Sequence, residues 1–142
     1  MSQNVFYLDQ PKPEGDWIGW KAWLELAGSH HVGPAVGLFA VAATQAKQAD
    51  LPYSLQFQRE PDNAFDKKAI AAYGTVGSET WRLGYLPRGE AQELAKFDVS
   101  MPLSGRVMSV KFLNDSVYVR VQVLVPSKKW RTAQGWEPKP RK

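Results

Sequence analysis

One segment of this sequence concentrates residue types that bind anions and stack on rings. Residues 58–70, QREPDNAFDKKAI, contain an arginine, a Pro-Asp-Asn turn, and then an aromatic ring, an acid and two lysines. We expect Asp62 or Asn63 to cap a single helical turn that starts near Ala64, because such a cap directs free backbone N–H groups toward an anion. The segment therefore predicts a binding pocket, although a simple turn with solvated charges explains the same residues.

Each side chain of this predicted pocket would have its own role. Phe65 would offer a ring, and Asp66 a hydrogen-bond acceptor. Phosphate contacts would come from the neighbouring cations, which are Lys67, Lys68 and Arg59.

A second segment, WRLGYLPR over residues 81–88, would bring further groups to the end of a strand. Gly84 within a strand pattern predicts a β-bulge or the close approach of another backbone. Tyr85 and Arg88 would then lie where the strand ends and the next helix begins. Taken alone, this segment has a simpler interpretation without a binding role, in which Tyr85 is half-buried and Arg88 is solvated.

The elements that must position these segments are mostly strands. Apolar and polar residues alternate, or β-branched residues accumulate, over residues 23–27, 53–59, 69–73, 81–86, 103–112 and 116–125. Helices are predicted over the alanine-rich residues 34–48 and over residues 89–97, and a hairpin at Leu113-Asn114-Asp115. About six strands with one or two short helices predict a mainly β fold, either a small antiparallel barrel or a strongly bent sheet.

The two ends of the chain differ from this body in composition. Residues 1–22 mix prolines and glycines with aromatic rings, which predicts an irregular arm before a domain over residues 23–125. The net charge is +4, but residues 126–142 carry +5 and residues 1–125 carry −1. We expect residues 126–142 to form a flexible tail that attracts polyanions through interleaved tryptophans and cations, among them Lys128, Lys129, Trp130 and Arg131.

Several classes of site are excluded by what the sequence lacks. It has no cysteine, which rules out disulfides and thiolate metal sites. His30 and His31 are adjacent, and on a strand they would point to opposite faces, so we expect no metal site and no cofactor. No apolar run approaches the roughly 18 residues needed to span a bilayer, and the N-terminus has no signal core, which predicts a soluble, cytoplasmic protein.

Together the two segments resemble the HIRAN domain, a module found at the N-terminus of certain helicases and as a stand-alone bacterial protein. REPDNAFDKKAI (residues 59–70) is followed by LGYLPRGEAQELA (residues 83–95), after an upstream segment that ends in Gly28-Ser29-His30-His31. The resemblance covers roughly residues 24–125. It leaves out the N-terminal arm and the basic tail.

The resemblance implies an OB-like β-barrel that captures the 3′ end of single-stranded DNA in a pocket. Asp66 would accept a hydrogen bond from the terminal 3′-hydroxyl, while Phe65 and Asn63 would shape the base site. Tyr85 and Arg88 would lie along the DNA backbone, with Arg88 toward a phosphate.

Three positions depart from the helicase-linked members of this family. His30 and His31 stand where those members have tyrosines, and Ser29 stands where they have an arginine. A histidine ring offers less stacking area than tyrosine, and Ser29 offers no phosphate contact, so we expect weaker end binding or a changed end preference. The full predicted DNA-binding set outside the tail is Asp66, Phe65, Asn63, Tyr85, Arg88, His30, His31, Arg59 and Lys67.

Three functional hypotheses follow. The first is a non-enzymatic module that binds single-stranded DNA, at its 3′-hydroxyl end, in DNA repair or replication-fork processing. The second is a protein-interaction module for a helicase or nuclease encoded separately. The third, least favoured, is a metal-dependent hydrolase using Glu60, Asp62 and Asp66, whose charges the neighbouring cations neutralise and which no nucleophile motif accompanies.

Overall fold

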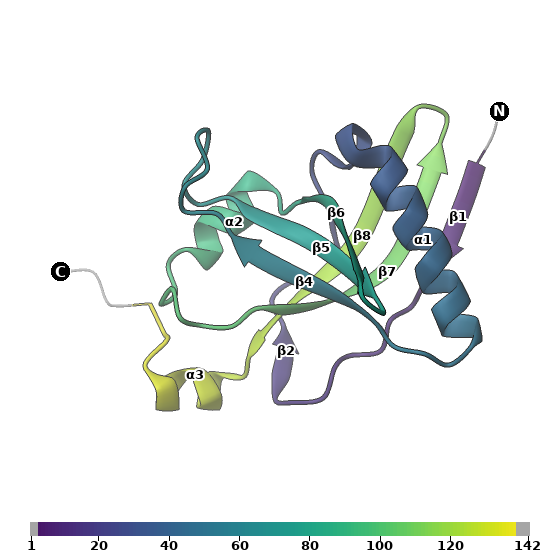
Figure 1. Cartoon of the computed structure of the whole chain (residues 1–142). Helices are drawn as coiled ribbons and strands as arrows, with labels where there is room; N and C mark the ends of the chain where they lie inside the picture. Colours follow the sequence, from purple (N-terminus) through teal and green to yellow (C-terminus); the bar gives the residue numbers. More distant parts are fainter. Residues whose placement is uncertain (1–2, 139–142) are drawn as a thin grey trace.

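One antiparallel sheet with eight strands forms the framework of the fold (Figure 1). The computed structural model describes residues 3–138. The strands are β1 (Gln3–Tyr7), β2 (Trp17–Gly19), β3 (Leu24–Glu25), β4 (Tyr53–Arg59), β5 (Ile70–Val76), β6 (Glu79–Tyr85), β7 (Ser104–Leu113) and β8 (Ser116–Pro126). The helices are the 3-10 helix η1 (Ser29–Val32) and the α-helices α1 (Gly33–Gln48), α2 (Arg88–Leu94) and α3 (Lys128–Gln134).

The sheet is bent but its hydrogen-bond ladder is not closed. Its order is β2-β8-β7-β4-β5-β6, with β1 added to β7 and β3 added to β8. An isolated bridge between Ala27 and Tyr85 links the end of β6 to the residues after β3. The mainly β, antiparallel architecture is therefore confirmed, whereas within residues 3–138 the paired strands do not complete the expected barrel.

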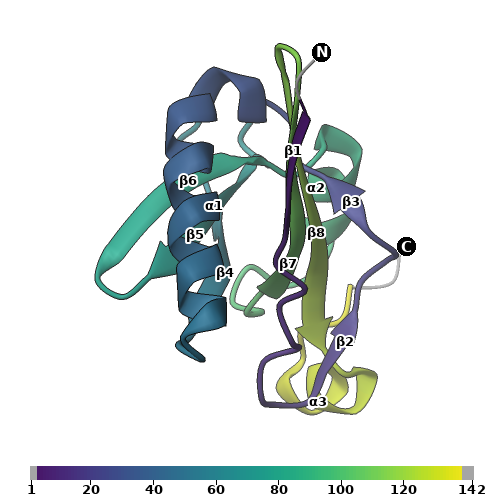
Figure 2. The same cartoon turned by 90° about the vertical axis from the view of Figure 1, so that its right-hand side faces the viewer.

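Strand alternation and one long helix build the core. Val119, Val121 and Val123 of β8 are buried, as their strict alternation predicted. Helix α1 confirms the predicted helix over residues 34–48, and it buries the face that carries Val36, Phe39 and Ala43. The Phe39 ring lies 6.2 Å from the ring of Trp81 on β6, so α1 is fixed against this part of the sheet. Figure 2 shows α1 on one side of β1, β7 and β8, with β3 on the other.

Both ends of the chain are more ordered in secondary structure than the sequence suggested. The predicted irregular arm is wrong in part, because β1 pairs with β7 and β2 pairs with the end of β8. The predicted strand over residues 23–27 shortens to β3. The predicted flexible tail is wrong for residues 128–134, which form α3, while its residues 139–142 lie outside the described residues.

Tertiary contacts explain why α3 forms. The Ser127 side chain accepts a hydrogen bond from Trp130 N and donates one to Asp16 Oδ2 at 2.6 Å. The Trp130 ring packs edge-on against Trp17 at 5.2 Å and lies 5.7 Å from Trp136. The two ends of the chain are thus joined by a capping residue and by tryptophans. Among the described residues, no helix is long and apolar enough to cross a membrane.

Candidate functional site

The turn between β4 and β5 is folded around the side chain of Asn63. Its Oδ1 accepts hydrogen bonds from the backbone N–H groups of Phe65 at 2.9 Å and Asp66 at 3.0 Å. The backbone closes beneath it, with Glu60 N donating to Ala69 O at 2.9 Å. The predicted helical turn from residue 64 does not form, and because Asn63 takes up these two N–H groups they are not free to bind an anion.

The turn and the end of β6 together form an open pocket of about 320 Å³. Phe65 is 97% exposed at its rim, so its whole ring is accessible. Tyr85 comes from the last residue of β6 and Arg88 from the first residue of α2. Five of the predicted side chains, those of Asn63, Phe65, Asp66, Tyr85 and Arg88, are thereby brought together. The pocket is lined by Ala27, Asn63, Phe65, Asp66, Ala69, Tyr85, Leu86, Arg88 and Ala91.

Asp66 and Arg88 face each other across this pocket without a hydrogen bond. Asp66 Oδ2 lies 3.8 Å from Arg88 Nε, and the Arg88 side chain is 75% exposed whereas that of Asp66 is 23% exposed. The other carboxylate oxygen, Oδ1, accepts from the backbone N–H of Lys68 at 2.9 Å. Asp66 therefore has a fixed position with one oxygen turned toward an exposed cation, which suits a ligand with both a donor and an anion.

A polar network beneath the pocket fixes Tyr85 and the turn. Glu60 accepts hydrogen bonds from Asn63 at 2.9 Å, from Tyr85 at 3.0 Å and from Arg82 at 2.8 Å. Arg82 also donates to the Tyr85 hydroxyl. The hydrogen bond from Asn63 holds the pKa of Glu60 below its usual range, and burial raises the pKa of Tyr85.

Sequence reasoning missed the part that Glu60 and Arg82 play. The sequence suggested Glu60 only as a metal ligand, and nothing in it singled out Arg82. Their part follows from the register of β5 and β6, which the sequence does not reveal: it pairs Ala71 with Tyr85 and brings the end of β6 beside the end of the turn. These two residues position the site rather than line it.

Arg59 and Lys67 lie outside this first pocket. They line a second, smaller hollow of about 140 Å³ on the other side of Ala69, together with Lys68 and Val99. Arg59 is half-buried, and burial lowers the pKa of its guanidinium. The structure therefore separates these cations from the ring and acid of the turn, although the two hollows share Ala69.

His30 and His31 are exposed on η1 and do not line the pocket. Their ring centroids lie 3.9 Å apart, so the expectation that they point to opposite faces of a strand is wrong. Ser29 is buried, and its hydroxyl donates to Leu83 O at 2.7 Å. It thus holds η1 against β6.

The basic C-terminal residues divide into two groups. Lys128 and Lys129 are exposed. Arg131 is held by Glu137 at 2.9 Å and by the carbonyl of Pro126 at 2.8 Å, and Trp130 is packed between other tryptophans. Of the four predicted tail contacts, only the two lysines are exposed, whereas Trp130 and Arg131 are half-buried.

The acids of the turn do not assemble into a metal centre. Within residues 3–138, no three His, Asp or Glu side chains are grouped so that they would hold a metal ion. Glu60 is instead occupied by Arg82, Tyr85 and Asn63, while Asp62 is exposed.

A crystal structure of a protein from Lactobacillus plantarum is similar to this chain. The two share 17% sequence identity and a TM-score of 0.42, over 87% of this chain and 99% of that one. No family model matches the sequence, and no curated protein does.

Proposed function

We propose that this chain is a binding module, not an enzyme, that takes the 3′-hydroxyl end of single-stranded DNA in the pocket around Asp66. Its setting would be DNA repair or replication-fork processing. The observation that carries the proposal is the convergence of Asn63, Phe65 and Asp66 with Tyr85 and Arg88, from segments about 20 residues apart in sequence, in one hollow. Their resemblance to the HIRAN domain supports the choice of ligand.

The chemistry of each side chain suits this ligand. The exposed ring of Phe65 offers a face on which a terminal base would stack. Asp66 is an acceptor for a hydroxyl, and a negatively charged 3′-phosphate in the same place would be repelled by it. Arg88 is exposed and close enough to Asp66 for a phosphate one nucleotide away to be reached.

A barrel-like arrangement belongs to the same proposal. The bridge at Ala27 and Tyr85 links the end of β6 to the residues after β3 beside the pocket, with N···O distances of 2.7 and 2.9 Å. We infer that the bent sheet serves as an OB-like frame whose seam holds the DNA end.

Substitution of Asp66 tests the proposal. The wild-type chain is expected to prefer an oligonucleotide with a 3′-hydroxyl over one with a 3′-phosphate by about 10-fold or more, because a hydrogen bond to a carboxylate is lost and repulsion is added. Asp66→Asn should remove most of this preference, measured by fluorescence anisotropy with the two oligonucleotides.

Asp62→Asn is the matched control, because it makes the same charge change in the same turn at an exposed side chain. It should keep the preference. End recognition would be contradicted if Asp66→Asn lowered the affinity for the 3′-hydroxyl and the 3′-phosphate oligonucleotide equally. It would also be contradicted if Asp62→Asn reduced the preference as much as Asp66→Asn does. Incubation of labelled DNA with the protein and magnesium should leave the DNA intact.

The protein-interaction hypothesis keeps one observation in its favour. Leu38 and Val41 on α1 are 61% and 47% exposed, and Leu51 just after the helix is 60% exposed. Exposed apolar side chains of this kind suit contact with an apolar partner surface. A stable complex with a helicase or nuclease that Leu38→Ser/Val41→Ser abolishes, together with no oligonucleotide binding at low salt, would favour this function over DNA binding.

A further inference from the structure

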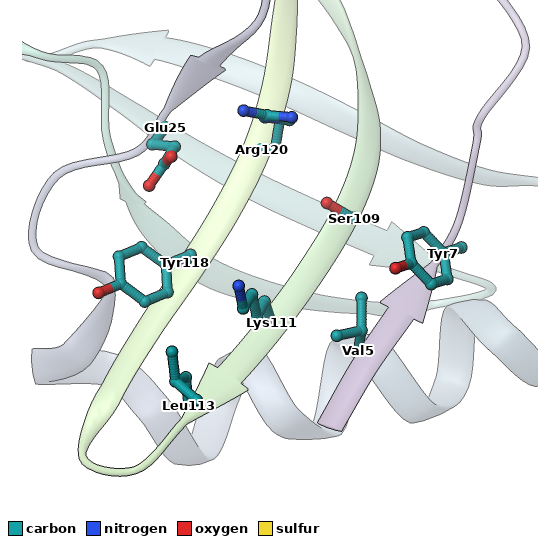
Figure 3. A pocket seen from close by; sticks show the side chains of 8 residues that line it. All are labelled: Val5, Tyr7, Glu25, Ser109, Lys111, Leu113, Tyr118 and Arg120. Atoms are coloured by element: carbon teal, nitrogen blue, oxygen red, sulfur yellow. The ribbon is translucent and has the colours of Figure 1, made fainter. Parts of the chain in front are cut away.

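A second surface with nucleic-acid chemistry lies on the sheet, outside the Asp66 pocket. Figure 3 shows it on β1, β7, β8 and β3, with the helix α1 behind the sheet. It is a shallow hollow of about 350 Å³. We call it the tyrosine face and define it by Tyr7, Ser109, Lys111, Tyr118, Arg120 and Glu25.

The strand register arranges these side chains in two rows. Tyr7 is paired with Ser109, Ser109 with Arg120, and Arg120 with Glu25, which makes one row across four strands. In the next row Lys111 is paired with Tyr118. Two strand spacings across the sheet and two residues along the strand separate the two tyrosines, which puts their backbones on the order of 12 Å apart, with Lys111 on the strand between them.

The tyrosine face is open to solvent because the opposite face of these strands packs into the hydrophobic core. Side chains alternate along a strand, and the intervening Val110 and Val119 are fully buried. Tyr7 and Tyr118 are instead 68% and 39% exposed. Neither tyrosine hydroxyl has a hydrogen-bond partner within residues 3–138, so no internal hydrogen bond holds either ring on this surface.

The charges of the tyrosine face are predominantly positive. Lys111 and Arg120 form no ion pair with any residue that the structure describes, while Glu25 is the one acid in its lining. Exposed aromatic rings beside unpaired cations are the combination with which proteins bind single strands, since rings stack on bases and cations neutralise phosphates. An apolar protein partner would leave both cations desolvated and unpaired.

We propose that the tyrosine face binds internal nucleotides of single-stranded DNA, with bases stacked on Tyr7 and Tyr118 and phosphates at Lys111 and Arg120. Glu25 borders this face and Ala27, two residues later, borders the Asp66 pocket. A strand held at its end in that pocket therefore reaches the tyrosine face by crossing the short segment after β3. Because this surface contacts no end, its binding does not depend on end recognition.

A circular single-stranded DNA tests this inference, because it has no 3′ end for the Asp66 pocket. We expect a fluorescent circle of poly-dT to bind the wild-type chain at low salt. Tyr7→Ser/Tyr118→Ser should weaken binding at least about 5-fold for each ring lost, whereas Tyr7→Phe/Tyr118→Phe keeps the rings and should bind like wild type.

Lys111→Gln/Arg120→Gln should reduce the slope of log K against log salt by about 1.4, because two phosphate contacts are lost.

Controls separate this surface from the rest of the molecule. Lys12→Gln removes an exposed lysine elsewhere and should leave circle binding unchanged. Asp66→Asn should also bind the circle like wild type, even if it loses the preference for a 3′-hydroxyl. A linear trinucleotide with a 3′-hydroxyl should bind equally well to the wild type and to the serine variant, since it fills only the pocket.

Two results would overturn the inference. One is a wild-type chain that does not bind the circle, or binds it as tightly after both tyrosines are replaced by serine. The other is a chain that is dimeric by light scattering, becomes monomeric in the serine variant and binds the circle unchanged, because the face would then join two copies. Neither result bears on 3′-end discrimination, which the linear oligonucleotides measure separately.

Discussion

At the scale of single residues, Glu60 connects the turn to the strand that carries Tyr85. Its carboxylate accepts three side-chain hydrogen bonds, from Asn63, Tyr85 and Arg82. These donors favour the charged form of Glu60 and lower its pKa from the ordinary value of 4.5. A group whose pKa is lower in the folded state than in the unfolded state contributes its full stabilisation only where it is charged in both states.

The sign of the resulting pH dependence follows directly. The contribution of Glu60 to the free energy of unfolding is complete above its unfolded pKa, near 4.5, and is lost as the pH falls through its lower folded pKa. We expect wild type to be more stable than Glu60→Gln at pH 7, and the difference to shrink steadily below about pH 4.5. Urea unfolding of both proteins between pH 7 and pH 3 measures this difference in the free energy of unfolding. The contributions of the other carboxylates cancel in the difference because both proteins share them. A difference that does not change with pH would contradict the network.

At the scale of elements, the end of β6 depends on a glycine. Gly84 has φ 142°, and the pairing of β5 with β6 shifts register next to it, so the predicted bulge is confirmed. The predicted close approach is confirmed too, because a Cβ at this position would lie 2.7 Å from Ala27 O and 2.8 Å from Ser29 Oγ. The bridge that joins β6 to the residues after β3 therefore requires a residue without a side chain.

Gly84→Ala should consequently destabilise the fold by about 2–5 kcal/mol, from backbone strain together with overpacking. Gly77→Ala is the matched control, because Gly77 has φ 60° but a methyl group added to it would have no atom within 4 Å, so only backbone strain of about 1–2 kcal/mol remains. Urea unfolding compares the two variants. Equal losses of stability would show that the contact with Ala27 is unimportant. Because Tyr85 follows Gly84, end binding should fall as well.

Periodic elements were predictable, and elements that depend on tertiary partners were not. β4 matches its prediction at both ends, and α1, β7 and β8 match theirs to within a residue or two, because regular burial on one face leaves a regular pattern in sequence. β2 has only three residues and exists because it pairs with the end of β8. α3 has no buried stripe, yet Ser127 at its N-cap and Gly135 with φ 73° after its last turn are boundary signals that the sequence did contain.

The candidate site was predictable where its residues lie close together in sequence. Asn63, Phe65 and Asp66 belong to one turn, and Tyr85 and Arg88 to one strand end, so two segments were enough to name the pocket. The polar network could not be foreseen, because it depends on how β5 and β6 pair. The tyrosine face was hidden for the same reason, since Tyr7 and Tyr118 become neighbours only through β7.

At the scale of the whole molecule, positive charge and binding pocket are separated. Residues 126–142 carry +5 and residues 1–125 carry −1, and residues 128–134 of the basic segment form a helix that packs through Trp130 against Trp17 of β2. Lys128 and Lys129 stand exposed in the first turn of α3, where the helix dipole disfavours cations. Their position is therefore unfavourable for stability, which suggests a role in attracting a polyanion.

Neutralising Lys128 and Lys129 tests whether they attract DNA without contributing to the stability of the fold. Lys128→Gln/Lys129→Gln should leave the free energy of unfolding unchanged or raise it by up to about 1 kcal/mol, because two cations leave the positive end of a helix dipole. The same variant should lower the slope of log K against log salt for single-stranded DNA by about 1.4, while the preference for a 3′-hydroxyl over a 3′-phosphate stays as in wild type. Lys12→Gln/Lys96→Gln removes the same charge elsewhere and should change the slope less. If both pairs of substitutions reduced the slope equally, attraction would come from net charge alone, and the position of α3 would not matter to how DNA reaches the pocket.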